Sequence, residues 1–177
     1  MITVELHFCG DLAGFLRRPL RGAFPVRHDL HGKTAVKDVI EACGIPHPEV
    51  DLIVVLDGTG DARRALDFAF QLATPARLAV YPVPAPPDEL PAAPRLQARG
   101  CRRFIADGHL GALVRHLRLA GIDTAYEHDA DDGRLLEIMA RDDRALLTRD
   151  RRLLMHSIVR HGYCPRSDDP EEQARGA

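Results

Sequence analysis

The segment from Phe104 to Asp150 constrains the fold more than any other part of the chain. It begins with Phe104-Ile-Ala, a short apolar run that stops on Asp107, and it ends with Ala145-Leu-Leu-Thr-Arg, which leads to Asp150. Leucine-rich stretches of helical periodicity lie between these runs. Strands that alternate with helices form a parallel sheet, and the strands deliver their last residues to one edge, where ligands bind. The sequence therefore predicts an α/β domain with acids converging at that edge.

The elements expected in this half follow the same alternation. We expect strands at 103–106, 123–126 and 145–148, and helices that carry Leu110, Leu113, Val114 and Leu117, that begin at Asp132, and that span 151–159. Asp169-Pro-Glu-Glu172 has the features of a helix start, with a capping acid and proline at the first position.

The N-terminal half has a different order of elements. Residues 2–8 alternate apolar and polar side chains, and we expect further strands at 24–30, 50–56 and 77–83, with a turn at 57–60. Thr34 is expected to cap a helix that ends at Gly44. Two strands, a helix and then more strands predict a β-grasp, ubiquitin-like domain. His47 and Glu49, beside Pro46 and Pro48, are interpreted as turn residues.

Proline marks the expected boundary between the halves. The stretch from Pro82 to Pro94 holds six prolines, which fix φ and remove backbone donors. We therefore expect a β-grasp domain at 1–84, a linker at 85–100 and a parallel α/β domain at 101–177.

Composition excludes some classes of protein. The 24 basic and 26 acidic residues nearly cancel, so a nucleic-acid partner would require a local patch. Nearly all the basic residues are arginine, the better fork for phosphate. The chain lacks an apolar run of membrane-spanning length and a secretory signal pattern, so we expect a cytoplasmic protein with no membrane association.

The four cysteines are widely scattered and form no C-x-x-C pair, which favours free thiols. His156, His161 and Cys164 form the one local cluster that zinc could use, although the paired spacing of zinc sites is missing.

The acids suggest chemistry on phosphodiesters. Hydrolysis requires an activated water and neutralisation of the leaving oxygen, and cations held by carboxylates provide both. Asp107, Asp132 and Asp150 are the expected catalytic and metal-binding residues, with Asp131 and Glu137 as further ligands and Thr148 as a residue that orients a carboxylate or water. The alternative is that each aspartate only caps the helix that follows it.

Arginines near these acids could contact an RNA backbone without reading its sequence. The candidates are Arg115, Arg118, Arg149, Arg151 and Arg152. For Arg115 and Arg118, a solvated helix face with ordinary ion pairs is an equal alternative. The chain has six Phe, three Tyr and no Trp, which argues against an extensive base-stacking surface.

Several motifs resemble a known bacterial arrangement. The segment from Gly44 to Gly58, followed by Val80-Tyr-Pro, resembles the ubiquitin-like domain that precedes the mut-seven C-terminal type RNase domain. The segment from Phe104 to Gly111, together with Asp132 and Leu147-Thr-Arg-Asp-Arg151, resembles that RNase domain, a relative of PIN nucleases. The resemblance implies a PIN-like fold and places Asp107, Asp132 and Asp150 at the family's acidic positions.

Two features depart from the family's pattern. Its members usually carry a zinc ribbon of paired cysteines after this point, and the ribbon is absent here; truncation and natural loss both stay open. Gly133-Arg134 stands where acids commonly follow Asp132, which leaves the composition of the metal shell open.

We therefore expect a ribonuclease that uses Mg²⁺ or Mn²⁺, with an N-terminal domain that docks a protein partner. One alternative is a non-catalytic RNA- or protein-binding adaptor with a degenerate nuclease fold. Another is a flavodoxin-like phosphotransfer domain, which is disfavoured because such domains usually need a lysine near the acids and none follows Lys37.

Overall fold

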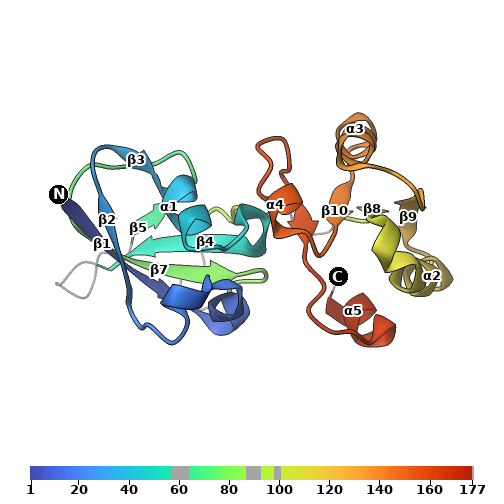
Figure 1. Cartoon of the computed structure of the whole chain (residues 1–177), viewed down its shortest axis with the longest axis horizontal. Coiled ribbons are helices and arrows are strands. Elements are labelled where there is room, and N and C mark those ends of the chain that lie inside the picture. Colours follow the sequence, from blue (N-terminus) through green and yellow to red (C-terminus); the bar gives the residue numbers. More distant parts are fainter. Residues whose placement is uncertain (57–63, 87–92, 98–100, 177) are drawn as a thin grey trace. The chain divides into compact units, whose positions relative to one another are not determined.

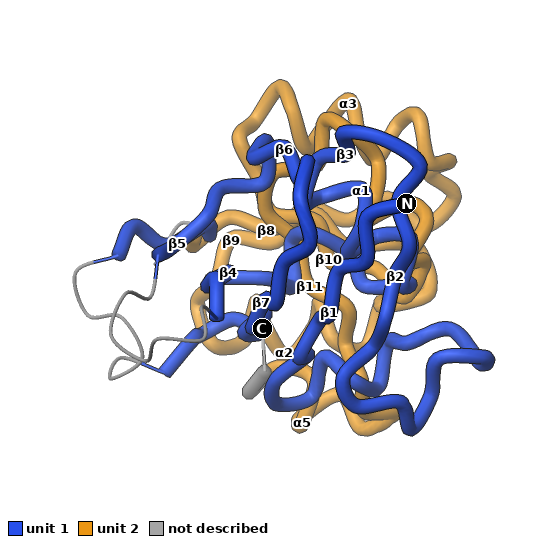
Figure 2. Tube along the Cα trace, turned by 90° about the vertical axis from the view of Figure 1, so that its left-hand side faces the viewer, with its two compact units in different colours: residues 1–97 blue, residues 98–177 orange. Residues whose placement is uncertain are grey.

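In the computed structural model, residues 1–56, 64–86, 93–97 and 101–176 are described, without the side chains of residues 175 and 176. The chain divides into unit 1, Met1–Gln97, and unit 2, Ala98–Ala177 (Figures 1 and 2). The turn expected at 57–60 lies outside the described residues.

The described residues of unit 1 form the strands of a mixed sheet, a small two-stranded sheet, one α-helix and short 3₁₀ turns. The elements are β1 (Ile2–Phe8), η1 (Gly10–Phe15), η2 (Arg18–Leu20), β2 (Val26–Leu30), β3 (Thr34–Ala35), α1 (Val36–Ala42), η3 (His47–Glu49), β4 (Val50–Val55), β5 (Arg64–Leu66), β6 (Gln71–Leu72) and β7 (Ala76–Pro82).

The main sheet of unit 1 has the strand order β2-β1-β7-β4-β5. The first and last long strands, β1 and β7, pair in parallel at its centre, and the other pairs are antiparallel. Alternation along β1 buries Val4 and Leu6, and α1 buries Val36, Val39 and Ile40 completely. This arrangement confirms the β-grasp fold.

The helix start in unit 1 differs from the expectation. Thr34 does not cap α1; it pairs with Leu72 in the two-stranded sheet β3-β6, and its hydroxyl donates to the Gly32 carbonyl. Ala35 precedes the helix without a side-chain cap. The predicted stop at Gly44 is correct: its φ is +101°, and a Cβ there would lie 2.9 Å from the Phe15 carbonyl oxygen.

Part of the expected linker packs on unit 1. Asp51 of β4 is 2% exposed, and its two carboxylate oxygens accept hydrogen bonds from the amides of Ala85 (3.0 Å) and Gln97 (3.3 Å). The Gln97 side chain donates in turn to the carbonyls of His47 and Val50. Residues 87–92 and 98–100 of the expected linker lie outside the described part of the chain.

Unit 2 alternates strands and helices as expected. Its elements are β8 (Arg103–Ala106), η4 (Gly108–Leu110), α2 (Gly111–Leu119), β9 (Asp123–Tyr126), α3 (Asp132–Asp142), β10 (Ala145–Leu147), α4 (Arg151–Leu154), β11 (Gly162–Tyr163) and α5 (Pro170–Gly176). The sheet order is β11-β10-β8-β9, and all its pairs are parallel, which confirms the predicted α/β class.

Helix α2 covers one face of this sheet. Its Leu113, Val114 and Leu117 are buried against Phe104 and Leu147 of β8 and β10. Helix α3 also contacts β8 and β10, and it buries Leu135, Leu136, Ile138 and Met139. Both α2 and α3 therefore pack on the strands whose carboxyl ends form the edge of the sheet.

The helix expected at 151–159 is shorter than predicted, because α4 ends at Leu154. After it, the Ile158 amide donates to Nδ1 of His156, and the Val159 amide donates to the His156 carbonyl, so the chain turns. None of the four cysteines forms a disulfide bond. Among the described residues, no helix is long and apolar enough to span a membrane.

Candidate active site at the carboxyl edge of the parallel sheet

Asp107 and Asp150 meet through Thr148, which follows β10. The Thr148 side chain is fully buried, and its hydroxyl donates to Oδ2 of Asp107 at 2.8 Å. Oγ1 of Thr148 also accepts a hydrogen bond from the Asp150 amide at 2.9 Å. The Asp107 amide donates to the Leu147 carbonyl, so the pairing of β8 and β10 continues to the edge of the sheet. The parallel topology therefore brings these two predicted site residues together.

Both aspartates also bind the amides that follow them. Oδ1 of Asp107 accepts the His109 amide at 3.2 Å, and Oδ1 of Asp150 accepts the amides of Arg152 (2.7 Å) and Leu153 (3.3 Å). Within the described residues, Oδ2 of Asp150 has no hydrogen-bond partner. The capping role and the shared edge therefore coexist, and Asp150 keeps one oxygen for a ligand.

The loop after β9 closes against the residue that follows Asp107. The Tyr126 hydroxyl donates to the Gly108 carbonyl at 2.8 Å and lies 3.1 Å from Nδ1 of His128. A Cβ on Gly108 would lie 2.3 Å from the His128 carbonyl oxygen, so only glycine permits this approach. Tyr126 and His128 are not among the predicted site residues, and the only sequence signal for them is a tyrosine at the end of a strand.

The same loop leads to Asp131 and Asp132, which differ in what they bind. Asp131 caps α3, because its Oδ1 accepts the Arg134 amide at 2.8 Å. Asp132 is the first residue of α3 and is exposed; in the described part of the chain its carboxylate makes no hydrogen bond or ion pair. Asp132 therefore comes after β9, the strand beside β8, and both of its carboxylate oxygens lack a partner among the described residues.

Glu137 is engaged elsewhere. Arg134 pairs with Glu137 at 3.1 Å and with Glu127 at 2.9 Å. The hydrogen bond from Arg134 also lowers the pKa of the Glu127 carboxyl. A role for Glu137 as a ligand would require this exposed ion pair to open.

The donor set fits a hydrated cation better than a closed metal cage. Among the residues that the structure describes, no group of three His, Cys, Asp or Glu side chains converges closely enough to hold a metal ion. This finding includes His156, His161 and Cys164. Asp150 follows β10 and Asp132 comes after β9, the two strands that flank β8, and both aspartates have carboxylate oxygens without a partner among the described residues. Mg²⁺ keeps several waters when few carboxylates bind it.

The candidate arginines fall into separate groups. Nε of Arg118 donates to the Thr124 carbonyl near the start of β9, which places its guanidinium away from the carboxyl edge. Arg149 binds Asp168 at 2.7 Å and also the Ser167 carbonyl. Arg115 and Arg152 are exposed, and Arg151 is half-buried. Arg149, Arg151 and Arg152 lie within two residues of Asp150 in the chain, and the charge of Arg149 is paired with Asp168.

Comparisons with known families agree with the two units. Residues 102–177 match the family model described as Mut7-C RNAse domain, and residues 1–88 match the model described as Mut7-C ubiquitin. Comparison with curated proteins and with solved structures gave no match. The edge formed by Asp107, Thr148 and Asp150 lies inside the RNase match. The chain therefore combines a Mut7-C ubiquitin-like domain with an RNase domain of the Mut7-C family.

Proposed function

We propose that unit 2 hydrolyses RNA phosphodiester bonds with the help of Mg²⁺ or Mn²⁺. The observation that supports this function best is the Asp107–Thr148–Asp150 arrangement at the carboxyl edge, within the residues that match an RNase domain. Acids from separate elements of a parallel sheet meet where such sheets bind ligands.

Each residue of the edge has a distinct task in this proposal. Asp107, Asp132 and Asp150 would hold the cation, which when bound supplies an activated water and neutralises the leaving oxygen. Thr148 fixes the carboxylate of Asp107 and the backbone of Asp150, so both acids are oriented before RNA arrives. Asp131 supports α3 beside them.

The arginines after β10 would hold the RNA backbone. Arg149 and Arg151 flank Asp150 in the sequence. Arg152, whose amide donates to Asp150, is exposed. Their planar guanidinium groups suit phosphate oxygens. Contacts of this kind position a strand without selecting its sequence.

A second candidate function is a non-catalytic adaptor that keeps the nuclease fold. The specific observation in its favour is that Asp107, Asp131 and Asp150 each accept hydrogen bonds from nearby helix amides. In the adaptor, these aspartates would be structural caps, and RNA or protein would bind without cleavage.

Metal titration by calorimetry and RNA cleavage distinguish the two functions. The nuclease predicts heat on adding Mn²⁺ and cleavage of a single-stranded RNA, and Asp107→Asn should lose both. Asp129→Asn is the matched control, because Asp129 lies in the loop after β9 and is 98% exposed. Absence of both heat and cleavage in the folded wild-type chain would support the adaptor.

For unit 1 we propose a docking role toward a protein partner. The match to a ubiquitin-like domain supports this role. None of the proposed cleavage residues lies in unit 1. Deleting residues 1–84 should leave cleavage by unit 2 intact and abolish partner binding.

A further inference from the structure

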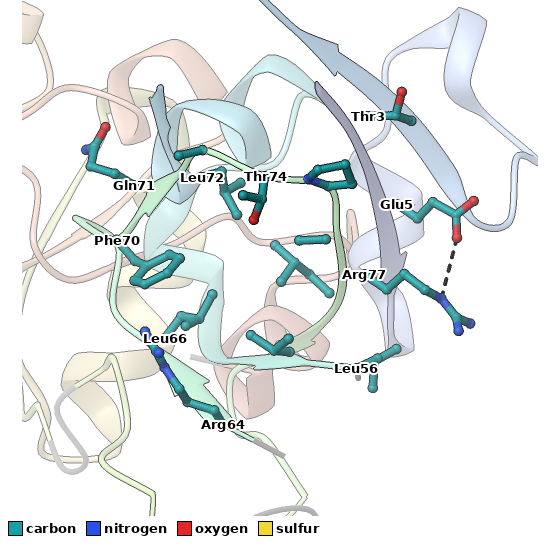
Figure 3. Close-up of a pocket in the computed structure, with 15 residues that line it drawn as sticks. Thr3, Glu5, Leu56, Arg64, Leu66, Phe70, Gln71, Leu72, Thr74 and Arg77 are labelled. Atoms are coloured by element: carbon teal, nitrogen blue, oxygen red, sulfur yellow. Dashed lines mark ion pairs between the residues drawn. The ribbon is translucent and has the colours of Figure 1, made fainter. Parts of the chain in front are cut away.

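Unit 1 contains a pocket of about 940 Å³ at one end of its sheet (Figure 3). It lies where β4 ends and β7 begins, beside β5 and β6. Leu66, Leu72 and Leu78 contribute to its lining and are 5%, 2% and 0% exposed. A volume of this size is in the range of sites that accept small ligands or side chains.

One wall of the pocket combines Phe70 with Arg64. The guanidinium carbon of Arg64 lies 4.7 Å from the centroid of the Phe70 ring, and Figure 3 shows the two side chains adjacent at the margin of the pocket. Among the described residues, Arg64 has no carboxylate partner. Asp67, which follows β5 in the connection to β6, makes no ion pair with Arg64. The stacked guanidinium therefore keeps its donors for an incoming anion.

The second arginine of the pocket is in a different state. Arg77 pairs with Glu5 at 3.5 Å, as the dashed line in Figure 3 marks, and Glu5 also pairs with Arg27 at 3.1 Å. Arg77 and Arg27 therefore share one carboxylate, which compensates the charge of Arg77 in part. The pocket thus has a largely apolar lining, and Arg64 is its arginine without a carboxylate partner in the described part of the chain.

We propose that this pocket docks a peptide segment of a partner protein that presents a large aliphatic side chain next to an aspartate or glutamate. The aliphatic group would fill the space above the leucines, and the carboxylate would pair with the planar guanidinium of Arg64. Stacking on Phe70 restricts Arg64 beforehand, which reduces the entropy lost on binding.

The rim of the pocket favours a peptide as the occupant. Gln71 and Thr74 are exposed polar residues of the lining, and their side chains can bond peptide groups on either side of the inserted residue. This inference rests on the docking role proposed for unit 1, and it names the surface and the chemistry of the partner. It does not depend on RNA cleavage by unit 2.

The test uses the full chain labelled with ¹⁵N and two capped peptides, acetyl-Leu-Asp-Leu-amide and acetyl-Leu-Asn-Leu-amide. We expect the Asp peptide to shift the amide signals of Phe70, Gln71, Leu72 and Leu78. The Asn peptide should bind about tenfold more weakly, because it lacks the charge-assisted bond.

Two variants then assign the preference to Arg64. In Arg64→Gln the two peptides should bind equally, whereas Arg27→Gln should keep the preference, because Arg27 is also an exposed arginine but lies outside the pocket lining. Phe70→Leu should weaken the preference by removing the aromatic face.

Several outcomes would overturn the inference. They are equal binding of both peptides to wild type, signal changes that map away from the pocket, and absence of binding at millimolar peptide. RNA cleavage by the same Arg64→Gln sample should equal that of wild type, so failure of the pocket and failure of the nuclease are read separately. Loss of partner binding on deleting unit 1, with no peptide effect at the pocket, would leave the docking role intact and overturn only this site.

Discussion

The hydroxyl of Thr148 donates to Oδ2 of Asp107 across 41 positions of sequence, at a distance of 2.8 Å. The bond joins the ends of two parallel strands and leaves Thr148 completely buried beneath the two partly or fully exposed acids that it links. Mutation of a residue that hydrogen-bonds to a metal ligand typically lowers metal affinity or activity by about 10- to 100-fold.

Replacing Thr148 with valine should reduce RNA cleavage by about 10- to 100-fold, because Asp107 and the Asp150 amide lose their common partner. The unpaired Asp150 amide should also lower the free energy of unfolding by about 1–2 kcal/mol. Thr148→Ser keeps the hydroxyl and should retain most of the activity. Cleavage rates and urea unfolding of both variants test this prediction, and equal activity of the valine variant would contradict it.

Asp131 and Asp132 form a matched pair in which capping and catalysis separate. Asp131→Ala removes the cap of α3 and should cost about 1 kcal/mol of stability. Asp132→Ala removes a carboxylate without a hydrogen-bond partner in the described chain, so it should leave unfolding nearly unchanged while lowering cleavage and Mn²⁺ affinity. Calorimetric titration and thermal unfolding measure both effects. If Asp132→Ala had full activity, Asp132 would not be a ligand.

Gly108 and Gly133 should respond to alanine in opposite directions. Gly108→Ala would place a Cβ 2.3 Å from the His128 carbonyl oxygen, so the loop after β9 must shift, at a cost of about 1–3 kcal/mol. Gly133 lies in α3, where the new Cβ would be 3.4 Å from Oδ1 of Asp131, and alanine there should stabilise the chain by about 0.5–1 kcal/mol. Urea midpoints test the contrast; similar shifts in both variants would contradict the packing of His128 on Gly108.

Asp51 should be important for stability, although it is far from the candidate active site in sequence. Asp51→Asn replaces an acceptor with an NH₂ donor that faces another backbone donor, at Ala85 or Gln97. We expect a loss of about 1–3 kcal/mol in urea unfolding of unit 1. Asp67→Asn is the control, since Asp67 is exposed and should tolerate the change. An Asp51 variant as stable as its control would show that the packed segment 93–97 does not depend on this bond.

Stability should fall at mildly acidic pH through His161. Partial burial lowers the pKa of His161 below its ordinary value of 6.5, with Asp143 opposing and Arg160 adding to the shift. The folded state therefore binds fewer protons than the unfolded chain, so the stabilisation is complete above about pH 6.5 and decreases as pH falls through the unfolded pKa toward the folded one. Urea unfolding at several pH values should show a smaller decrease for His161→Gln than for wild type. An unchanged slope, judged against His109→Gln at an exposed site, would contradict this assignment.

The sequence by itself determined the elements that depend on local periodicity. Alternation in β1, the apolar stripe of α2 and the acid at the end of β8 are properties of neighbouring residues, and the structure confirms the two fold classes that they predicted. Local rules failed at Thr34, where a cap worth about 1 kcal/mol gave way to strand pairing with distant Leu72.

Only the tertiary structure decided which side chains share partners. The link from Thr148 to Asp107, the difference between Asp131 and Asp132, and the contact of His128 with Gly108 all join segments whose approach depends on how helices pack on the sheet. Arg118 is likewise directed to Thr124 by the path of α2. Hydrogen bonds form only at donor–acceptor distances of about 3 Å. A sequence pattern can therefore predict which residues lie at one edge of a sheet, but not which of them are in contact there.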